Sequence, residues 1–240
     1  MSPEFTVVYD NNPYDARLRT AWGFSCLVRT GQTSLLFDTG GDGSVLLSNM
    51  RQLAIDPTEV SAVVLSHIHS DHVGGLEAFL ERNGDVTVYA PMSFPPSFKH
   101  NIGAAGAKLV EVHEAVELLD NVHTTGELGQ EIVEQSLIVR TAKGLVVITG
   151  CAHPGVVAIV DKAKKLLKED VLLVMGGFHL GGKSEGELEA IVSDFRKLQV
   201  RYVGPCHCSG DAARRLFKRE YGERFIEVGV GKVLAFGDLK

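Results

Sequence analysis

Residues 66–72 read Ser-His-Ile-His-Ser-Asp-His, and this run constrains the chain more than any other feature of its sequence. Three imidazoles and a carboxylate so close together are costly unless they share a cation. The apolar run from Val60 to Leu65 predicts a buried strand before them, and Gly74 and Gly75 lead into a helical pattern that begins at Leu76. The ligand-type side chains are therefore expected on a loop between a strand and a helix, where functional residues are often displayed.

The spacing within this run indicates how its side chains could bind metal. His67 and His69 are two positions apart, so in an extended backbone they point to the same side. Asp71 and His72 are adjacent and could serve a second cation beside the first. Neutral imidazole nitrogen and carboxylate oxygen suit zinc, iron or manganese. The alternative, a polar loop that happens to be rich in histidine, is less favoured because histidine rarely clusters.

Three later histidines each follow a predicted strand and lie in a glycine-rich loop: His153, His179 and His207. Glycine lets the backbone come close to a cation or a bound anion. A single histidine after a strand is more often structural, so these three become candidates mainly because residues 66–72 already predict a metal site. For His179, a role in the site and a structural role remain equally open.

Two further residue types could support the ligands. Asp38 ends a predicted strand, where it would either cap a turn or orient a ligand histidine through a hydrogen bond. Cys151 is expected to be buried beside the ligands. A separate thiolate zinc site with Cys206 and Cys208 is an alternative, although no second cysteine pair completes it.

Residues 91–107 contain three prolines and two glycines, and they predict a loop that could cover a substrate pocket. Lys99 and His100 within this segment are the candidate substrate contacts.

Composition narrows the class of protein. The 240 residues carry 24 Lys and Arg against 30 Asp and Glu, and this net charge of −6 argues against nucleic acid or an anionic membrane as partner. No signal peptide, membrane-spanning run or disulfide-framework spacing is visible, so a reduced, cytoplasmic protein is expected. Strand-rich halves with interspersed helices predict an α+β fold, with two sheets packed together inside helical layers and a single domain over residues 1–240.

In these motifs the chain resembles the metallo-β-lactamase superfamily over nearly its whole length. The resemblance rests on Asp38, the run 66–72, His153 and His207, which occur in the superfamily's order. It implies a four-layer αβ/βα sandwich of two mixed β-sheets packed face to face, with helices on the outer faces and metals at one edge.

The resemblance also implies ligand sets for one or two divalent cations, with zinc favoured and iron, manganese or magnesium as alternatives. The first cation would be held by His67, His69 and His153. The second would be held by Asp71, His72 and His207. Asp71 is the expected catalytic group that steers water, with His179 as a second catalytic candidate.

One departure from the superfamily pattern concerns the strand predicted at Val171–Met175. The superfamily usually places a metal-bridging aspartate after this strand, whereas Gly176-Gly177-Phe178-His179 follows here. Either the second metal is held more weakly or His179 takes over part of the role.

Three functions are compatible with these features. The first is a hydrolase that uses a metal-activated hydroxide on a small anionic ester or phosphoester. The second is a transferase that joins a pterin methyl diphosphate to an arylamine ribose phosphate, because the strings around His153, His179 and His207 look like the branch containing dihydropterin ribofuranosylaminobenzene phosphate synthases. The third is a non-catalytic or redox iron-binding protein. Substrate and oligomeric state are left open.

Overall fold

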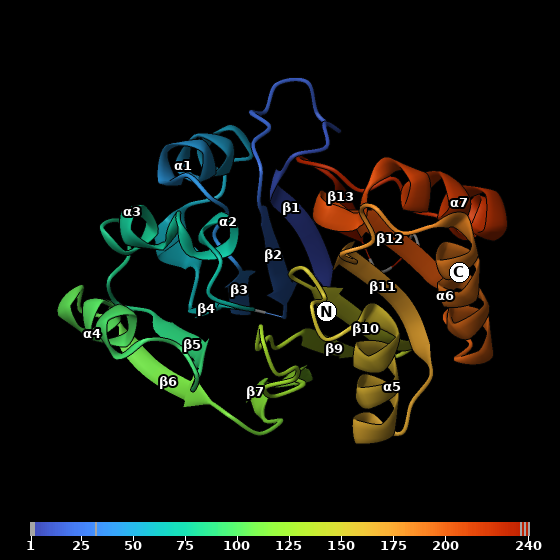
Figure 1. Cartoon of the computed structure of the whole chain (residues 1–240). Coiled ribbons are helices and arrows are strands. Elements are labelled where there is room, and N and C mark those ends of the chain that lie inside the picture. Colours follow the sequence, from blue (N-terminus) through green and yellow to red (C-terminus); the bar gives the residue numbers. More distant parts are fainter. Residues whose placement is uncertain (1–2, 32, 236, 238, 240) are drawn as a thin grey trace. The chain divides into compact units, whose positions relative to one another are not determined.

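The structure, a computed structural model, describes residues 3–31, 33–235, 237 and 239. The chain divides into two compact units. Unit 1 consists of Met1–His113 and Gly229–Lys240, and unit 2 consists of Glu114–Val228. Each unit contains one mixed β-sheet with its own helices (Figure 1), so the expected α+β class is confirmed. That residues 1–240 form a single domain stays a prediction.

The sheet of unit 1 has the order β13-β1-β2-β3-β4-β5-β6 within the described residues. Pairing is antiparallel from β13 to β3 and parallel from β3 to β6. The strands are β1 (Glu4–Asp10), β2 (Phe24–Thr30), β3 (Thr33–Phe37), β4 (Ala62–Val64), β5 (Thr87–Pro91), β6 (Lys108–Val112) and β13 (Val233–Ala235). Since parallel strands end at the same edge, the loops after β3 and β4 start beside one another.

Helices α1, α2, α3 and α4 belong to unit 1, with a 3-10 turn η1 (Pro57–Glu59) between α1 and β4. Asp42 caps α1 because its carboxylate accepts hydrogen bonds from the backbone N–H groups of Ser44 and Val45. Leu46 of α1 and Phe79 of α3 are buried in one apolar core with Val63 of β4. The helix bounds are α1 (Gly43–Gln52), α2 (Ser70–Val73), α3 (Leu76–Leu80) and α4 (Pro96–Ala104).

The prediction of a loop over residues 91–107 is wrong for most of that segment, because α4 occupies Pro96–Ala104. Pro96 stands at the first helical position, where proline's missing N–H costs nothing and its fixed φ favours the helix. Ile102 anchors the helix in the core of unit 1. The prolines therefore mark where the helix begins.

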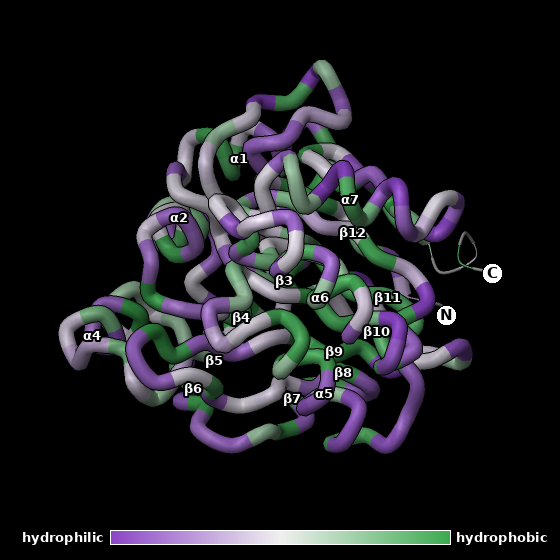
Figure 2. The backbone as a smooth tube through the Cα atoms, turned by 45° about the vertical axis from the view of Figure 1, so that its right-hand side comes forward, coloured by the Kyte–Doolittle hydropathy of each residue, from purple (hydrophilic) through white to green (hydrophobic). Residues whose placement is uncertain are grey.

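The sheet of unit 2 has the order β12-β11-β10-β9-β8-β7 within the described residues. Pairing is antiparallel from β7 to β10 and parallel from β10 to β12. The strands are β7 (Glu117–Leu119), β8 (Val122–Thr124), β9 (Leu137–Thr141), β10 (Gly144–Thr149), β11 (Val171–Gly177) and β12 (Tyr202–Cys206). Around β9 the chain is mostly hydrophobic, as its green colour shows (Figure 2).

Three helices accompany this sheet: α5 (Val156–Leu167), α6 (Glu185–Lys197) and α7 (Asp211–Tyr221), with 3-10 turns η2 (His207–Ser209) and η3 (Gly222–Arg224). A capping box begins α6, because Ser184 and Glu187 exchange side-chain to backbone hydrogen bonds. Phe178, Phe195 and Phe217 pack together with ring centroids 5.4–5.8 Å apart. This core holds the β11 end and α7 in place.

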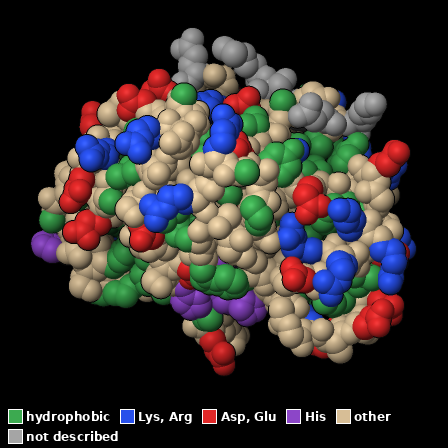
Figure 3. All heavy atoms as spheres, turned by 90° about the horizontal axis from the view of Figure 1, so that it is seen from above, with side chains coloured by type: hydrophobic (Ala, Val, Ile, Leu, Met, Phe, Trp, Pro, Cys, Tyr) green, Lys and Arg blue, Asp and Glu red, His purple; other side chains and the backbone are tan. Residues whose placement is uncertain are grey.

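On the face shown in Figure 3, Lys and Arg side chains are interspersed with Asp and Glu. Many exposed charges are paired, as Lys218 is with Glu227 at 3.0 Å. The four cysteines, all among the described residues, are not joined in disulfides. Among the described helices, none combines the length and the apolar character that crossing a membrane requires.

Candidate metal centre

In unit 1, His67 and His69 lie on the loop that joins β4 to α2, as the sequence predicts for residues 66–72. His67 is fully buried, and His69 is the residue at the N-terminal cap of α2. His67 Nε2 lies 3.2 Å from His69 Nδ1. Two ring nitrogens that face each other at this distance can bind one cation together, since Zn–N bonds are about 2.0–2.1 Å long.

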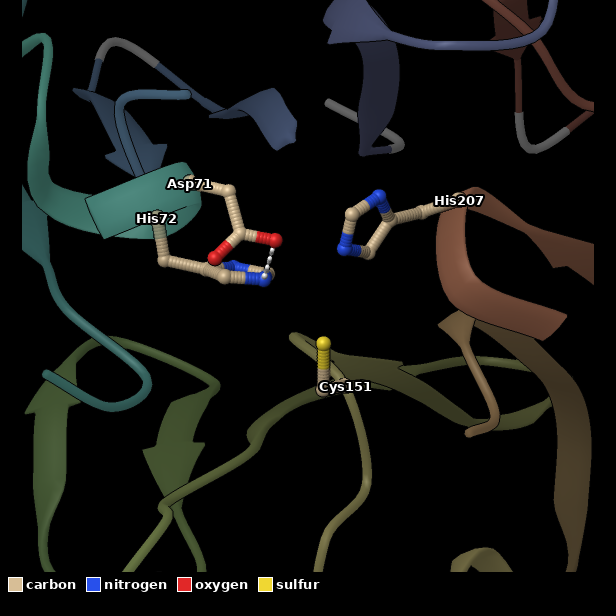
Figure 4. Close-up of side chains that lie close together, drawn as sticks. All are labelled: Asp71, His72, Cys151 and His207. Carbon is tan, nitrogen blue, oxygen red and sulfur yellow. Dashed lines mark ion pairs between the residues drawn. The ribbon is translucent and has the colours of Figure 1, made fainter. Parts of the chain in front are cut away.

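Asp71 and His72 follow on α2 and form a second pair of ligand atoms. Asp71 Oδ2 lies 3.6 Å from His72 Nε2 (Figure 4). His72 is fully buried, whereas 19% of the Asp71 side chain is exposed. The carboxylate is therefore the part of this pair that solvent or a substrate can reach.

A buried hydrogen-bond network fixes the orientation of both buried histidines. Asp38 Oδ2 lies 2.7 Å from His72 Nδ1 and accepts a hydrogen bond from Ser66 Oγ at 2.7 Å. Ser66 Oγ is also 2.9 Å from His67 Nδ1. Because the carboxylate and the hydroxyl oxygen act as acceptors here, both imidazoles donate from Nδ1. Each is left with an Nε2 lone pair for a cation.

Asp38 holds this place with a left-handed backbone, at φ 57°. Aspartate tolerates this region better than most residues, but the conformation still carries strain. Asp38 Oδ1 also accepts the Ser66 backbone N–H at 2.7 Å. Through these hydrogen bonds Asp38 can orient the His72 ring, which is the role that the sequence predicts for it.

Glycines let α2 approach the loop after β3. A Cβ at Gly75 would lie 2.2 Å from the Thr39 carbonyl oxygen, and one at Gly74 would lie 2.4 Å from that of Gly41. Thr39 N–H donates to the His72 carbonyl at 2.8 Å. The loop of Asp38 and the helix of His72 are thus locked together.

In unit 2, the loop after β10 carries Cys151 and His153, and Glu134 holds this loop. The Glu134 carboxylate accepts backbone hydrogen bonds from Cys151 at 3.0 Å, Ala152 at 2.8 Å and His153 at 2.9 Å. Glu134 is almost fully buried. Sequence reasoning missed Glu134, because a single acid between two strands has no spacing that distinguishes it from a surface residue.

His207 lies on η2, directly after β12, with φ 47°. Its side chain and the Cys151 thiol are drawn in Figure 4, and Cys151 Sγ lies within 4.8 Å of a His207 ring nitrogen. The chain turns at His207, because β12 ends at Cys206 and η2 begins directly after it.

His179 lies just beyond β11 with φ 50°. One of its ring nitrogens and the thiols of Cys151 and Cys208 all lie within 4.8 Å of one another. Its ring also packs on that of His153, with centroids 4.4 Å apart. The structure thus brings His179 to the loops of His153 and Cys208. Residues 176–179, at the end of β11 and just after it, include no carboxylate.

Within the group of Cys151, His179 and Cys208, two side chains have shifted pKa values. Hydrogen bonds from Cys151 and His179, with the nearby His207, lower the pKa of Cys208 to about 4 despite partial burial. The hydrogen bond with Cys208 raises the pKa of His179. Both shifts favour a thiolate beside an imidazolium.

Lys99 and His100, the candidate substrate contacts, lie on α4. Lys99 Nζ pairs with Glu111 at 2.7 Å and donates to the Met92 carbonyl at 3.0 Å. His100 is exposed. Neither residue lines the cavity of about 570 Å³ in unit 1, which α4 forms with α2 and α3 from Ser70, Val73, Gly74, Leu76, Glu77, Leu80, Phe98, Asn101, Ile102, Ala104 and Ala105.

The donor chemistry of both units fits a divalent metal. Unit 1 offers oriented imidazole nitrogens and a partly exposed carboxylate, and unit 2 offers imidazoles and thiols on loops fixed by buried groups. These donors suit zinc and its neighbours in the transition series.

A family comparison agrees with this chemistry. The sequence model of the Metallo-beta-lactamase superfamily matches residues 23–160. The chain belongs to this superfamily. Most of its members are enzymes, and the fold of two mixed sheets with helices is the metallo-β-lactamase fold.

Individual relatives match almost end to end. The chain is 28% identical to the 7,8-dihydropterin-6-methyl-4-(beta-D-ribofuranosyl)-aminobenzene-5'-phosphate synthase of Methanocaldococcus jannaschii, over 97% of this chain and 96% of that protein. The crystal structure of Tm1679, described as a metal-dependent hydrolase of the beta-lactamase superfamily, is 30% identical with a TM-score of 0.80, covering 97% of this chain and 98% of the other. The metallo-beta-lactamase fold protein YhfI of Bacillus subtilis, 17% identical with a TM-score of 0.74 over 98% and 100%, shares the fold.

Proposed function

We propose that this protein is a metal-dependent hydrolase of a small anionic ester or phosphoester. The observation that carries the proposal is the Asp38 network, which turns Nε2 of His67 toward His69 and Nε2 of His72 toward Asp71. Buried histidines held in this tautomer are prepared to bind metal. The 30% identical metal-dependent hydrolase supports the choice of reaction.

The ligand sets follow the superfamily order. His67, His69 and His153 would hold one divalent cation, and Asp71, His72 and His207 would hold another, with zinc favoured by the nitrogen-rich donors. Bound there, the cations would supply Lewis acidity toward the substrate oxygen and activate water at neutral pH.

The protein's own residues perform the remaining tasks. The partly exposed Asp71 carboxylate accepts a hydrogen bond from the attacking water and orients it. Asp38 keeps His72 in one tautomer, and Glu134 keeps the His153 loop in one conformation. The apolar walls of the α2–α4 cavity suit the uncharged part of a substrate.

A second candidate function is a transferase that joins a pterin methyl diphosphate to an arylamine ribose phosphate. The observation that favours it is the 28% identity to the Methanocaldococcus jannaschii synthase over 97% of this chain. In that reaction the arylamine nitrogen forms a bond to the pterin methylene carbon, diphosphate leaves, and the nitrogen loses a proton to solvent.

One set of assays tests both functions. Untreated protein is analysed for metals, and the purified protein is offered phosphoesters, carboxylic esters and the pterin diphosphate with and without the arylamine. Hydrolysis without any acceptor supports the first proposal, and diphosphate release that requires the arylamine supports the second.

Matched variants show whether turnover depends on the proposed ligands. His67→Ala is expected to lose bound metal and activity together, whereas His113→Ala, an exposed histidine, should keep both. Full metal content in His67→Ala would contradict the ligand assignment.

A further inference from the structure

The end of β11 leaves the proposed second cation short of a ligand. Residues 176–179 are Gly-Gly-Phe-His and provide no carboxylate. The ligand-type side chain there is His179, whose ring nitrogen is grouped with the thiols of Cys151 and Cys208 within 4.8 Å. If the proposed function holds, the second cation has only Asp71, His72 and His207 from the superfamily set.

A cysteine of unit 2 lies near one of these ligands. Cys151 Sγ lies within 4.8 Å of a His207 ring nitrogen. One tetrahedral zinc ion, with bonds of about 2.3 Å to sulfur and 2.0 Å to nitrogen, holds such atoms about 3.6 Å apart. The pair is therefore close enough to share a cation with little side-chain movement.

Both partners are held firmly. Glu134 fixes the backbone of the Cys151 loop, and the Cys151 side chain is 4% exposed. Gly177 makes room on the other side, because a Cβ there would lie 2.7 Å from Cys208 Sγ and 3.1 Å from His207 Cδ2. A rigid, nearly buried thiol beside a histidine is well prepared to bind metal.

We propose that Cys151 Sγ is a direct ligand of the second cation, in the place of the acid that is missing after β11. The Cys151 thiol releases its proton to solvent when the metal–sulfur bond forms. Cys208 hydrogen-bonds to Cys151, and His179 hydrogen-bonds in turn to Cys208. Because thiolate is a soft ligand, the second position favours zinc or cobalt over magnesium or manganese.

This proposal rests on the proposed function, and a titration with Co²⁺ tests each of them by a different signal. Metal-free protein is titrated with Co²⁺ while absorbance is recorded. Wild type is expected to bind two equivalents, and the second should produce a near-ultraviolet sulfur-to-cobalt charge-transfer band. In Cys151→Ser that band should vanish and the second equivalent should bind more weakly, by at least the roughly 10–100-fold typical of an outer-shell change.

Further variants show whether the band is lost because the sulfur ligand is gone or because the protein misfolds. Cys151→Asp should restore the second equivalent without the band, which shows that the site still forms. Cys206→Ser is the matched control, since Cys206 is buried and belongs to no group of metal-ligand side chains among the described residues. Cys206→Ser and Cys208→Ser should both keep the band.

Three results would overturn the assignment. Wild type that binds two equivalents without the band rejects Cys151 and leaves the metal-dependent function standing. A band that vanishes in Cys208→Ser, alone or together with Cys151→Ser, assigns the sulfur ligation to Cys208 or to a two-thiol site instead. Wild type that binds no cobalt rejects both this proposal and the proposed function.

Discussion

At the residue scale, the buried carboxylate of Asp38 decides what His72 and His67 can do. Both carboxylate oxygens of Asp38 accept hydrogen bonds in this network. Asp38→Asn replaces one oxygen with an NH₂ group, whose N–H would then face a donor of Ser66 or His72. We expect metal affinity to fall about 10–100-fold with the fold retained. Competition with a chromophoric chelator measures the affinity. Asp42→Asn, at the exposed cap of α1, is the matched control and should bind metal normally.

A second residue-scale effect concerns pH and stability. Burial lowers the pKa of His123 in β8 from its ordinary value of 6.5. Below pH 6.5 the unfolded chain takes up a proton that folded His123 resists, so the free energy of unfolding falls as the pH drops toward the folded pKa. His123→Gln should reduce this loss between pH 7 and pH 5 in chelator-treated protein. Urea unfolding measures it, and an equal loss in His123→Gln and wild type would contradict the prediction. His113→Gln is the exposed control.

At the scale of elements, the loop after β10 depends on Glu134. Glu134→Gln keeps one acceptor oxygen but points an amide donor at a backbone N–H of residues 151–153. We expect the free energy of unfolding to fall by about 1–3 kcal/mol. The metal that we propose His153 to bind should also exchange faster. Glu131→Gln, on the exposed surface, should change neither denaturant stability nor metal exchange; equal effects in both variants would show that Glu134 has no special role.

Elements that carry their own signals were predictable from sequence. The capping box at Ser184 and the apolar spacing of α5 depend on neighbours a few residues apart, so the sequence alone is sufficient to predict both helices. The sequence does not predict helix α4, because Pro95 and Pro96 are as typical of a loop as of the start of a helix. Within the candidate site, residues 66–72 were evident, but Glu134 acts through backbone groups 17 to 19 positions away. Such long-range contacts leave no local pattern.

At the scale of the whole molecule, the two compact units raise the question of cooperativity. The chain has a single tryptophan, Trp22, which lies in unit 1. Its fluorescence therefore reports on unit 1, whereas much of the far-ultraviolet circular dichroism comes from α5, α6 and α7 of unit 2. These two signals can be followed in the same denaturant titration.

If residues 1–240 form one domain, both signals should change at the same denaturant concentration with the same slope, because a two-state transition has no populated intermediate. The midpoint should also rise with added Zn²⁺ for both signals together, since a ligand that binds only the folded state stabilises all of it. Phe79→Trp/Trp22→Phe moves the probe into the buried core of unit 1 and controls for local fraying around Trp22. Fluorescence and circular dichroism midpoints that differ in both proteins would show two domains that unfold separately.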